Sequence, residues 1–403
     1  MNTTPLNTTP LNTAAQRILT THVGSLPRPE RVVTQLFAQD SGLNYNATEF
    51  DTTMAAEVAA VVARQAGSRV DVVSDGEMSK ISYATYIRHR LTGFELGEMP
   101  RATPRDLDDF PDFKERLAKL GATPKYQRPI CTGPIAVKDL SGLHKDIANL
   151  QAAVASAGST ATPPVRAFMN SASPGVIAVF QPNRYYPSTE QYLQALAEAM
   201  TTEYEAIVAA GLDLQIDAPD LAMGRHIKFR DVDDAEFLRN AHLQVEALNH
   251  ALRNIPAERI RMHVCWGNYE GPHHFDIGLE KIIDVVLKAK PATVLFEGAN
   301  PRHAHEWEVW AKAGREGKIA DHKVLAPGVL DSVNNFIEHP RLVAQRLLTY
   351  ADIVGRERVM AATDCGFGTF AGFGAIHPPI CFAKLASMAE GAKIASDQLW
   401  SRP

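Results

Sequence analysis

The sequence predicts an α/β protein folded as a (β/α)8 TIM barrel, and three observations lead to that fold class. Short β-branched runs alternate with long helical stretches, a pattern that favours a parallel sheet. Eight such runs occur, which is the number of strands that closes a barrel. No Gly-x-Gly-x-x-Gly turn follows the first run, as a doubly wound dinucleotide-binding sheet would require. An open α/β sheet is the alternative.

Eight short apolar runs are expected to form the barrel strands. They cover residues 18–23, 70–74, 165–169, 212–216, 261–264, 293–296, 324–326 and 358–362. Helical stretches follow most of them, at residues 52–65, 190–209, 236–253, 279–288, 303–313, 341–353 and 380–400. In the first of these helices Met54, Val58 and Val61 recur at helical spacing, so one face should be buried against the sheet.

The spacing of the strands predicts one catalytic barrel, residues 17–403, with an inserted segment between strands two and three. About 90 residues separate these strands, so residues 80–164 are predicted to cover one mouth of the barrel as a lid or an interface. A short amphipathic helix is expected near residues 113–120 within it. Residues 1–16 repeat Asn-Thr-Thr-Pro-Leu and are predicted to form a disordered tail.

Composition and charge exclude several classes of protein. Lys and Arg number 41 against 46 Asp and Glu, and a net charge of −5 gives no basic surface for nucleic acid. No apolar run approaches the ~18 residues that span a bilayer. Four widely spaced cysteines do not form the pattern of a disulfide-stabilised secreted protein. We therefore expect a cytoplasmic protein without nucleic-acid or membrane partners; whether copies of the chain associate stays open.

Polar and thiol residues collect at the predicted strand ends, where barrels build their active sites. His263 and Cys265 lie two residues apart on the fifth strand, so both side chains point to the same side. Glu297 ends the sixth strand and Cys365 the eighth. These nitrogen, sulfur and oxygen donors suit a tetrahedral zinc ion. The alternative is that the thiols are buried apolar groups and His263 a satisfied core residue.

The predicted ligand set also indicates the chemistry. One neutral imidazole, two thiolates and one carboxylate would leave zinc with a net charge of about −1 by this ligand count. Such an electron-rich ion is a weak acid for activating water. It suits an incoming thiol, which it would bind as a nucleophilic thiolate near neutral pH.

Together these motifs resemble the C-terminal catalytic barrel of cobalamin-independent methionine synthase and its single-barrel relatives. The matching stretches occur in the same order over residues 18–400, at 24–27 (Gly-Ser-Leu-Pro), 75–77 (Asp-Gly-Glu), 215–219, 263–265, 296–297, 327–331 and 364–366 (Asp-Cys-Gly). The resemblance implies a zinc-dependent alkyl transfer to a thiol. It assigns zinc binding to His263, Cys265, Glu297 and Cys365.

The resemblance also implies that homocysteine is held near Ser25, Glu77 and Asp217, with Glu77 and Asp217 in the catalytic machinery. Two carboxylates can grip an α-ammonium, while a turn N–H or a hydroxyl takes the α-carboxylate. Each residue has a structural alternative as well: a turn residue, a helix-start acid and an N-cap, respectively. Trp266, just beyond the ligands, would either wall the substrate pocket or pack in the core.

Three departures from the family pattern bear on the alkyl donor. Val333 stands where the long enzymes carry the histidine that protonates the folate leaving group, and the N-terminal half of those enzymes is absent. Phe180 replaces a tryptophan that stacks on the pterin, and it is expected to line the substrate site. Loss of the general acid should cost ~10²–10⁴ in rate with folate, so a methylcorrinoid, a sulfonium or an epoxide fits better.

Other histidines could supply a proton in place of Val333. His22, His226, His303 and His305 lie near strand ends. His303 and His305 are predicted to be a solvated first helical turn, and His273 and His274, in a Gly-Pro loop, to be exposed.

Three functions from different classes follow from these observations. The first is a zinc-dependent methyltransferase of methionine biosynthesis, with homocysteine or a similar small thiol and a methyl donor as partners. The second is a thiol–epoxide transferase or thioether lyase of the same family. The third is a metal-free barrel that acts as a binding protein or a decarboxylase.

Overall fold

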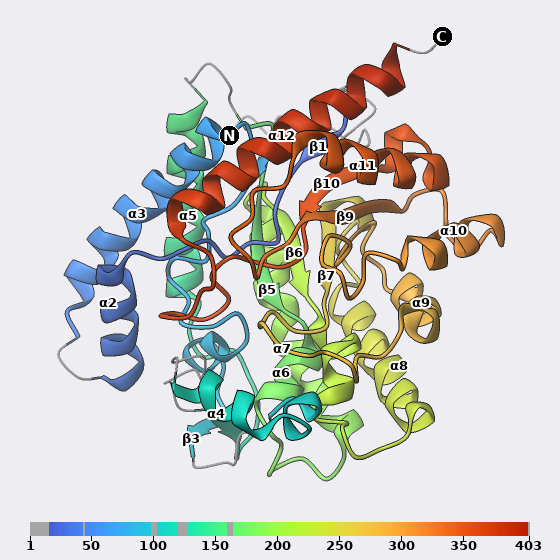
Figure 1. Ribbon diagram of the computed structural model, residues 1–403. Coiled ribbons are helices and arrows are strands. Elements are labelled where there is room, and N and C mark those ends of the chain that lie inside the picture. Colours follow the sequence, from blue (N-terminus) through green and yellow to red (C-terminus); the bar gives the residue numbers. More distant parts are fainter. Residues whose placement is uncertain (1–15, 43–44, 98–102, 120–127, 159–163, 402–403) are drawn as a thin grey trace.

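The computed structural model describes residues 16–42, 45–97, 103–119, 128–158 and 164–401. Eight parallel strands form a nearly closed barrel with helices around it, so the predicted fold class is confirmed (Figure 1). The barrel strands are β1 (Leu19–Thr20), β2 (Val72–Val73), β5 (Arg166–Ala172), β6 (Asp213–Asp217), β7 (Ile260–Val264), β8 (Thr293–Phe296), β9 (Val324–Leu330) and β10 (Met360–Thr363). The predicted disordered tail, residues 1–16, lies outside the described residues except for Gln16.

The sheet runs in the order β1-β10-β9-β8-β7-β6-β5-β2, so β1 and β2 meet at the seam of the barrel. These two strands are joined by a few hydrogen bonds around Asp71. The Asp71 N–H donates to Thr20 O at 3.2 Å, and the Asp71 carboxylate accepts the Thr20 N–H at 2.8 Å. Thr21 Oγ1 adds a bond to Val72 O at 3.0 Å. Because β1 and β2 are very short, side-chain hydrogen bonds take over part of the backbone pairing that would close the barrel.

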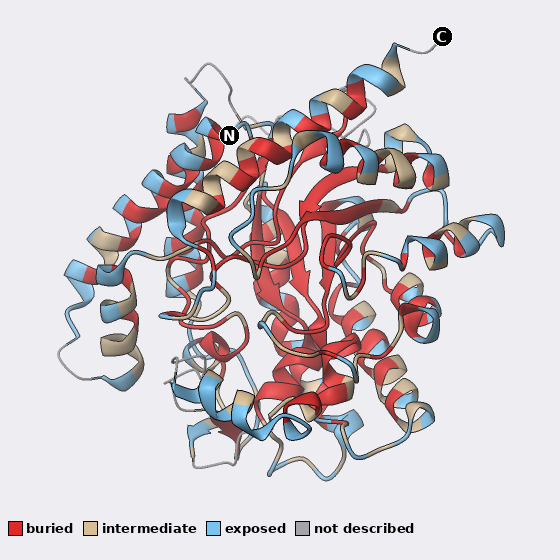
Figure 2. Cartoon of the chain, in the orientation of Figure 1, coloured by how far each residue is buried: buried red, intermediate tan, exposed pale blue. Residues whose placement is uncertain are grey.

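Helices surround the barrel, and Figure 2 shows that most of them bury one side (red) and expose the other (pale blue). They are α2 (Glu30–Ser41), α3 (Ala47–Gly67), α5 (Ser141–Ala157), α6 (Pro174–Phe180), α7 (Thr189–Ala209), α8 (Asp234–Ala251), α9 (Leu279–Lys288), α10 (Trp307–Arg315), α11 (Pro340–Val354) and α12 (Pro378–Trp400). Side-chain caps define several helix starts: Ser188 accepts the Gln191 N–H, and Asp233 accepts the Glu236 N–H. None of the described helices has the length and apolarity needed to cross a membrane.

The long connection between β2 and β5 contains both extra elements and a barrel helix. The extra elements are the 3₁₀ turns η1 (Thr85–His89) and η2 (Arg105–Asp108), the helix α4 (Pro111–Lys119), and the strands β3 (Phe94–Leu96) and β4 (Pro129–Cys131), which pair in antiparallel fashion. The helix predicted near residues 113–120 is thus confirmed. The connection ends with α5, which packs against α3 on the outside of the barrel.

The insertion is anchored through a buried polar network. Arg90 donates to Asp146 on α5 at 2.7 Å and pairs with Glu203 on α7 at 2.9 Å. Glu203 also accepts hydrogen bonds from Tyr86 and from Ser171 at 2.7 and 2.6 Å. Because all five side chains are buried, the start of the insertion has a fixed place against the barrel wall.

Candidate metal and thiol site

A buried cluster of one imidazole and two thiols lies at the carboxyl ends of the strands. His263 is on β7, Cys265 follows that strand, and Cys365 follows β10. Their ligand atoms all lie within 4.8 Å of one another. The barrel therefore brings together three of the four predicted ligands from positions about 100 residues apart in sequence.

The imidazole of His263 interacts with the charge of Cys265, but no described residue makes a well-formed hydrogen bond to either of its ring nitrogens. Both Nδ1 and Nε2 lack such a partner within the described part of the chain, although the side chain is buried. Burying an imidazole with both nitrogens unpaired is unfavourable. One nitrogen and two sulfur donors in a tight group are a set that divalent zinc accepts, so the residues present fit a metal ion.

The two cysteines differ in acidity. A hydrogen bond from Cys365 and the charge of His263 lower the pKa of Cys265 well below its ordinary value. Burial and the neighbouring Cys265 raise the pKa of Cys365. Cys265 is therefore the more acidic of the two thiols, and the thiolate is the form that binds metals.

Glu297, the fourth predicted ligand, lies beside this cluster with its carboxylate anchored. Its Oε1 is 3.9 Å from Cys365 Sγ and accepts the Trp266 N–H at 2.8 Å. Its Oε2 accepts Asn300 Nδ2 at 2.6 Å and the Arg302 guanidinium at 2.7 Å. Burial raises the pKa of Glu297 to about 7, against the opposing charge of Arg302.

Asp364 fixes the loop that carries Glu297. Its carboxylate accepts the backbone N–H groups of Gly298, Ala299 and Asn300, each at 2.8 Å, and also the Asn300 side chain. Because Asp364 directly precedes Cys365, one short segment of chain supplies a candidate ligand and positions another. The sequence motif contained Asp364, but nothing in the spacing indicated this role.

Glu77 and Asp217 form a pair of buried carboxylates at the mouth of the barrel. Asp217 accepts Asn170 Nδ2 at 3.0 Å and Gln215 Nε2 at 2.9 Å. Glu77 Oε2 has no hydrogen-bond partner among the described residues. Burial and the charge of Asp217 raise the pKa of Glu77 to about 7, and burial raises the pKa of Asp217 as well. Such a pair favours the arrival of a cation.

Lys80 was missed by sequence reasoning, although it follows Glu77 by three residues. Its buried Nζ donates to Asn170 O at 2.6 Å and lies 4.7 Å from the centre of the Tyr86 ring. The charge of Lys80 lowers the pKa of both Glu77 and Asp217, opposing the effect of burial. It therefore helps to keep the carboxylate pair ionised.

Ser25 lies beside the turn that follows Cys365. Its carbonyl accepts the Phe367 N–H at 2.8 Å, and a Cβ placed on Gly366 would overlap Ser25 Oγ. Arg28 joins the same loops, because it donates to Glu77 O at 2.8 and 3.0 Å and to Gly368 O. The turns after β1, β2 and β10 are thus held together next to the cysteines.

The two aromatic residues predicted to line the substrate site lie in different surroundings. Trp266 is completely buried; its indole donates to Ile277 O at 2.6 Å and stacks on His303 with ring centres 4.1 Å apart. Phe180, at the end of α6, packs against Tyr83 at 5.6 Å, which in turn packs against Phe370. Trp266 therefore packs behind the loop that carries Cys265. Phe180 belongs to an aromatic group with Tyr83, from the loop after β2, and Phe370, from the loop after β10.

The histidines considered as proton donors lie in distinct environments. His22 is buried, with Nε2 2.7 Å from Gln65, and burial lowers its pKa to about 3. The prediction that His303 is solvated was wrong: it is buried between the carboxylates of Asp276 and Glu306, at 3.0 and 2.9 Å. Val333 only donates its N–H to a neighbouring aspartate.

The histidine pair predicted to be exposed is split. His273 is buried, while His274 is exposed and lies 2.8 Å from Asp109 of the insertion. His273 is buried because its ring packs against Tyr269, with ring centres 4.2 Å apart, and because its backbone N–H donates to the buried Asp106 of the insertion. The insertion therefore covers the loop that follows the β7 ligands.

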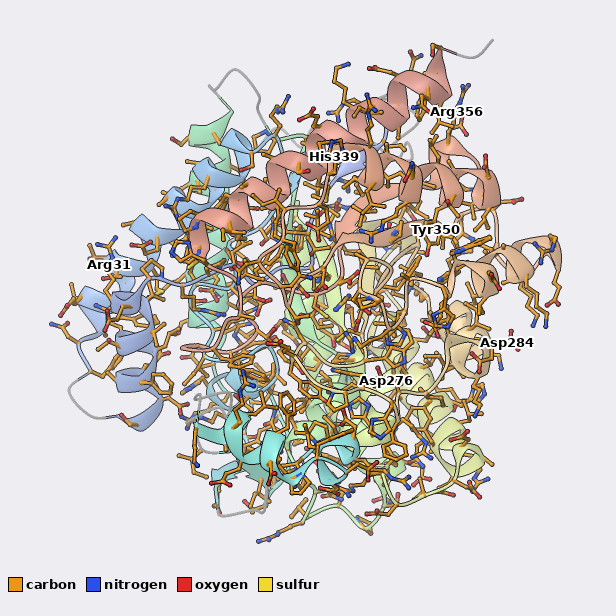
Figure 3. The ribbon with its side chains drawn as sticks, viewed as in Figure 1. Arg31, Asp276, Asp284, His339, Tyr350 and Arg356 are labelled. Carbon is orange, nitrogen blue, oxygen red and sulfur yellow. The ribbon has the colours of Figure 1, made fainter. Side chains whose placement is uncertain are left out.

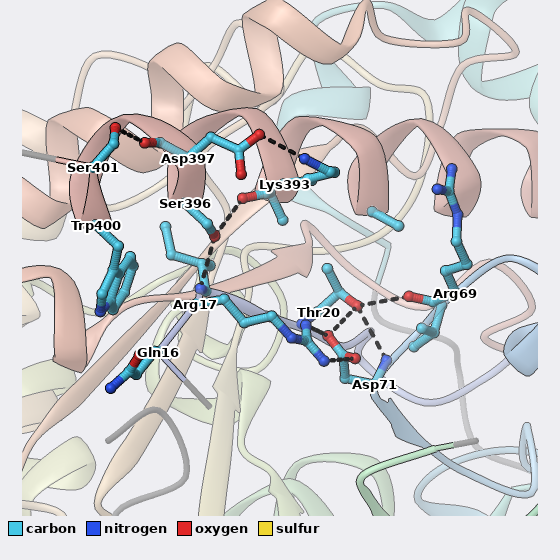
Figure 4. Close-up of a pocket in the computed structure, with 14 residues that line it drawn as sticks. Gln16, Arg17, Thr20, Arg69, Asp71, Lys393, Ser396, Asp397, Trp400 and Ser401 are labelled. Atoms are coloured by element: carbon cyan, nitrogen blue, oxygen red, sulfur yellow. Dashed lines mark hydrogen bonds and ion pairs between the residues drawn. The ribbon is translucent and has the colours of Figure 1, made fainter. Parts of the chain in front are cut away.

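A cavity of about 940 Å³ lies at the other end of the barrel (Figure 4). It is lined by the start of β1, the segment before β2 and the last turns of α12. Arg17 and Asp71 form an ion pair in it, at 2.6 and 2.7 Å. Since barrel enzymes work at the carboxyl ends of the strands, this cavity is separate from the candidate site.

Comparisons with known proteins agree with the motifs. No family model matches the chain. It is 24% identical over 387 residues to the methionine synthase of Saccharolobus solfataricus, covering 94% of this chain and 95% of that protein. It is 23% identical over 382 residues to the methionine synthase of Sulfurisphaera tokodaii, covering 94% and 93%.

The fold is likewise that of a solved structure. A B12-independent methionine synthase from Shewanella sp. W3-18-1, in complex with selenomethionine, superimposes with a TM-score of 0.72 at 18% identity, covering 95% of this chain and 99% of that one. The chain is therefore similar over nearly its whole length to single-barrel, cobalamin-independent methionine synthases, and the resemblance recognised from its motifs is confirmed.

Proposed function

We propose that this protein is a zinc-dependent S-methyltransferase that alkylates the thiol of homocysteine or of a similar small thiol. The observation that carries the proposal is the buried group of His263, Cys265 and Cys365, whose imidazole has no other partner among the described residues. Similarity to methionine synthases supports the choice of reaction. The tight grouping of one imidazole and two thiols favours a bound metal ion over the metal-free alternative.

His263, Cys265 and Cys365 would hold the ion, with Glu297 as the adjacent fourth donor. When bound, zinc supplies a Lewis acid that lets a substrate thiol bind as a thiolate near neutral pH. Cys265 already has a lowered pKa, which reduces the cost of deprotonating the ligand set before metal arrives.

Glu77 and Asp217 would bind the α-ammonium of the amino-acid thiol. Their buried carboxylates repel each other, and a cation between them offsets that repulsion. No described residue forms a hydrogen bond to Glu77 Oε2, so this oxygen can accept one from the ammonium. The hydroxyl of Ser25, which lies against Gly366 on the adjoining turn, would donate to the α-carboxylate.

Burial around the cluster would help the alkyl transfer itself. His263, Cys265 and Cys365 are each at most 8% exposed, so water is kept away from the thiolate. The sulfur forms a bond to the alkyl carbon while the bond from that carbon to the donor breaks. The electron pair stays on the donor.

The donor is the second part of the proposal. Val333 gives no acid at the position where a folate-dependent enzyme carries histidine, so a donor that leaves without a proton fits best. A methylcorrinoid and a sulfonium both meet that condition. We also place the reaction in the cytoplasm, because the four cysteines are all unpaired thiols.

Product analysis tests this function. Purified protein is incubated with homocysteine and, separately, methylcobalamin, S-methylmethionine, methyltetrahydrofolate or an epoxide, and the zinc content per chain is measured. Methionine from either of the first two donors, with one zinc per chain, is the expected result. A hydroxyalkyl thioether from the epoxide would instead establish the thiol–epoxide transferase. Absence of metal would leave the binding protein or decarboxylase.

A further inference from the structure

We infer that Arg302, held in turn by Asp276, is a positioning residue that fixes the carboxylate of Glu297 beside the cysteines. The inference rests on the proposed function, because it concerns how a candidate metal ligand is oriented. It goes beyond that function in assigning a role to a buried cluster of Asp, Arg and His outside the ligand set.

The nitrogen donors around Glu297 leave one acceptor site of its carboxylate, and that site faces the Cys365 thiol. A carboxylate offers about four acceptor sites. Asn300 and Arg302 take both sites of Oε2, at 2.6 and 2.7 Å, and the Trp266 N–H takes one site of Oε1. The remaining site belongs to Oε1, the atom that lies 3.9 Å from Cys365 Sγ. Glu297 is therefore set to offer a metal ion a single oxygen.

Arg302 connects this carboxylate to a second one. One of its terminal nitrogens bonds Glu297 Oε2 at 2.7 Å, and the other lies 3.4 Å from Asp276 Oδ2. The Arg302 side chain is 18% exposed, so solvent screens both contacts only weakly. A planar guanidinium can hold two carboxylates at a fixed angle, which an ammonium cannot do.

Asp276 is the centre of a cluster that joins three loops at the mouth of the barrel; it is labelled in Figure 3. Its Oδ1 lies 3.0 Å from His226 Nδ1, in the loop after β6. Its Oδ2 lies 3.0 Å from His273, in the loop after β7, and 3.0 Å from His303, in the loop after β8. Arg302 approaches the same oxygen.

The three histidines favour the ionised form of Asp276 and hold its carboxylate in position. Burial opposes ionisation, but the hydrogen bonds from His226, His273 and His303 lower the pKa of Asp276 far below its usual range. These contacts tie together the loop that follows Asp217 and the loops that carry Cys265 and Glu297. Asp276 therefore provides Arg302 with a rigid anchor.

The consequence for a metal site is specific. With Arg302 in place, Oε2 of Glu297 is occupied, so the carboxylate can bind an ion through one oxygen only. Without Arg302, only Asn300 still holds Oε2 and only the Trp266 N–H holds Oε1, so the carboxylate is oriented less firmly toward the cysteines. Outer partners of metal ligands typically contribute 10–100-fold in metal affinity.

The test compares metal binding in four proteins: the wild type, Arg302→Lys, Arg302→Met and Asp276→Asn. Zinc affinity is measured by competition with a chelator, and coordination by the visible absorption of the cobalt(II)-substituted protein. Arg302→Met is expected to lower zinc affinity 10–100-fold and to change the cobalt spectrum. Arg302→Lys should recover part of the loss, because it restores the charge without bridging two carboxylates.

A matched control separates positioning from general destabilisation. Arg259 is also a buried arginine that holds a carboxylate, Asp213, at 2.8 Å, but it lies at the amino ends of β6 and β7. Arg259→Met should leave zinc affinity and the cobalt spectrum unchanged. Thermal unfolding of each variant reports whether it folds; if Arg302→Met does not fold, Arg302→Lys and Asp276→Asn carry the test.

The outcomes are distinct. Wild-type affinity and spectrum in all Arg302 and Asp276 variants, or an equal loss in Arg259→Met, would overturn the inference and leave the proposed function standing. Failure of the wild type to bind zinc or cobalt would overturn the proposed function and the inference with it.

Discussion

Replacing Glu77 with glutamine is expected to stabilise the fold and weaken substrate binding at the same time. Glu77 is 2% exposed and repelled by the charge of Asp217, and within the described part of the chain no cation forms a hydrogen bond to its Oε2. A residue kept for function often destabilises the fold in this way. Glutamine keeps the shape of the side chain and removes its charge.

The size of the effect follows from the acidity of Glu77. Its pKa is about 7 in the folded protein, against 4.5 in the unfolded chain, because burial and Asp217 disfavour the charge. The folded state thus holds the proton more tightly, so stability falls as pH rises from about 4.5 to about 7. At about 1.36 kcal/mol per pKa unit, the full penalty above pH 7 is on the order of 3 kcal/mol.

Thermal unfolding at several pH values measures this penalty. With an unfolding entropy of about 2 cal/mol/K per residue, Glu77→Gln should raise the unfolding temperature by roughly 4 °C at pH 8. The gain should shrink to about 1 °C at pH 5, where the carboxyl group is largely protonated in the folded state. Homocysteine affinity should fall about 10–150-fold, which corresponds to the loss of one charge-assisted hydrogen bond.

A thiol that lacks the amino group is the matched control, since its affinity should not change in Glu77→Gln. The reasoning would be refuted if the variant were less stable than the wild type at pH 8. It would also be refuted if both thiols lost affinity equally, because the carboxylate would then not act on the ammonium.

Three further predictions concern the metal, the thiol pocket and the insertion. Cys365→Ser should abolish zinc retention and activity. The control variant Cys381→Ser, at a buried position in the core, should keep the wild-type zinc content. Equal zinc content in the two variants, measured by elemental analysis, would contradict the ligand assignment. Gly366→Ala should lower homocysteine affinity by about tenfold or more while the zinc content stays constant, because the added Cβ overlaps the hydroxyl of Ser25. If calorimetry finds the affinity unchanged, homocysteine binds elsewhere. Arg90→Met should lower the free energy of unfolding by about 3–5 kcal/mol in urea, since it removes the cation that pairs with the buried carboxylates of Asp146 and Glu203. A loss below about 1 kcal/mol would show that the network does not anchor the insertion.

Much of the fold could be predicted because a barrel repeats one simple unit. Each barrel strand corresponds to a short apolar run in the sequence, and the structure has a strand at each of the eight predicted positions. The helices α2, α5 and α6 were missed. The helix α6 (Pro174–Phe180) is buried on all sides and shows no amphipathic period, while α5 (Ser141–Ala157) lay in a stretch interpreted as insertion.

The site was predictable to the extent that topology alone places residues. Strand ends meet at one mouth, so His263, Cys265 and Cys365 could be grouped from sequence. The contacts that orient Glu297 were not predictable, because they depend on the irregular loops that bring Asp276 and Arg302 together. The error at His303 has the same cause, since one of its carboxylate partners is 27 residues away in sequence.

Zinc K-edge X-ray absorption, with and without homocysteine, is the most direct measurement of the central claim. The account predicts one zinc per chain with two sulfur neighbours in the free protein, from Cys265 and Cys365, and a third sulfur when homocysteine is added. An unchanged sulfur count on addition of a saturating thiol would contradict it, because the substrate would then bind without meeting the metal.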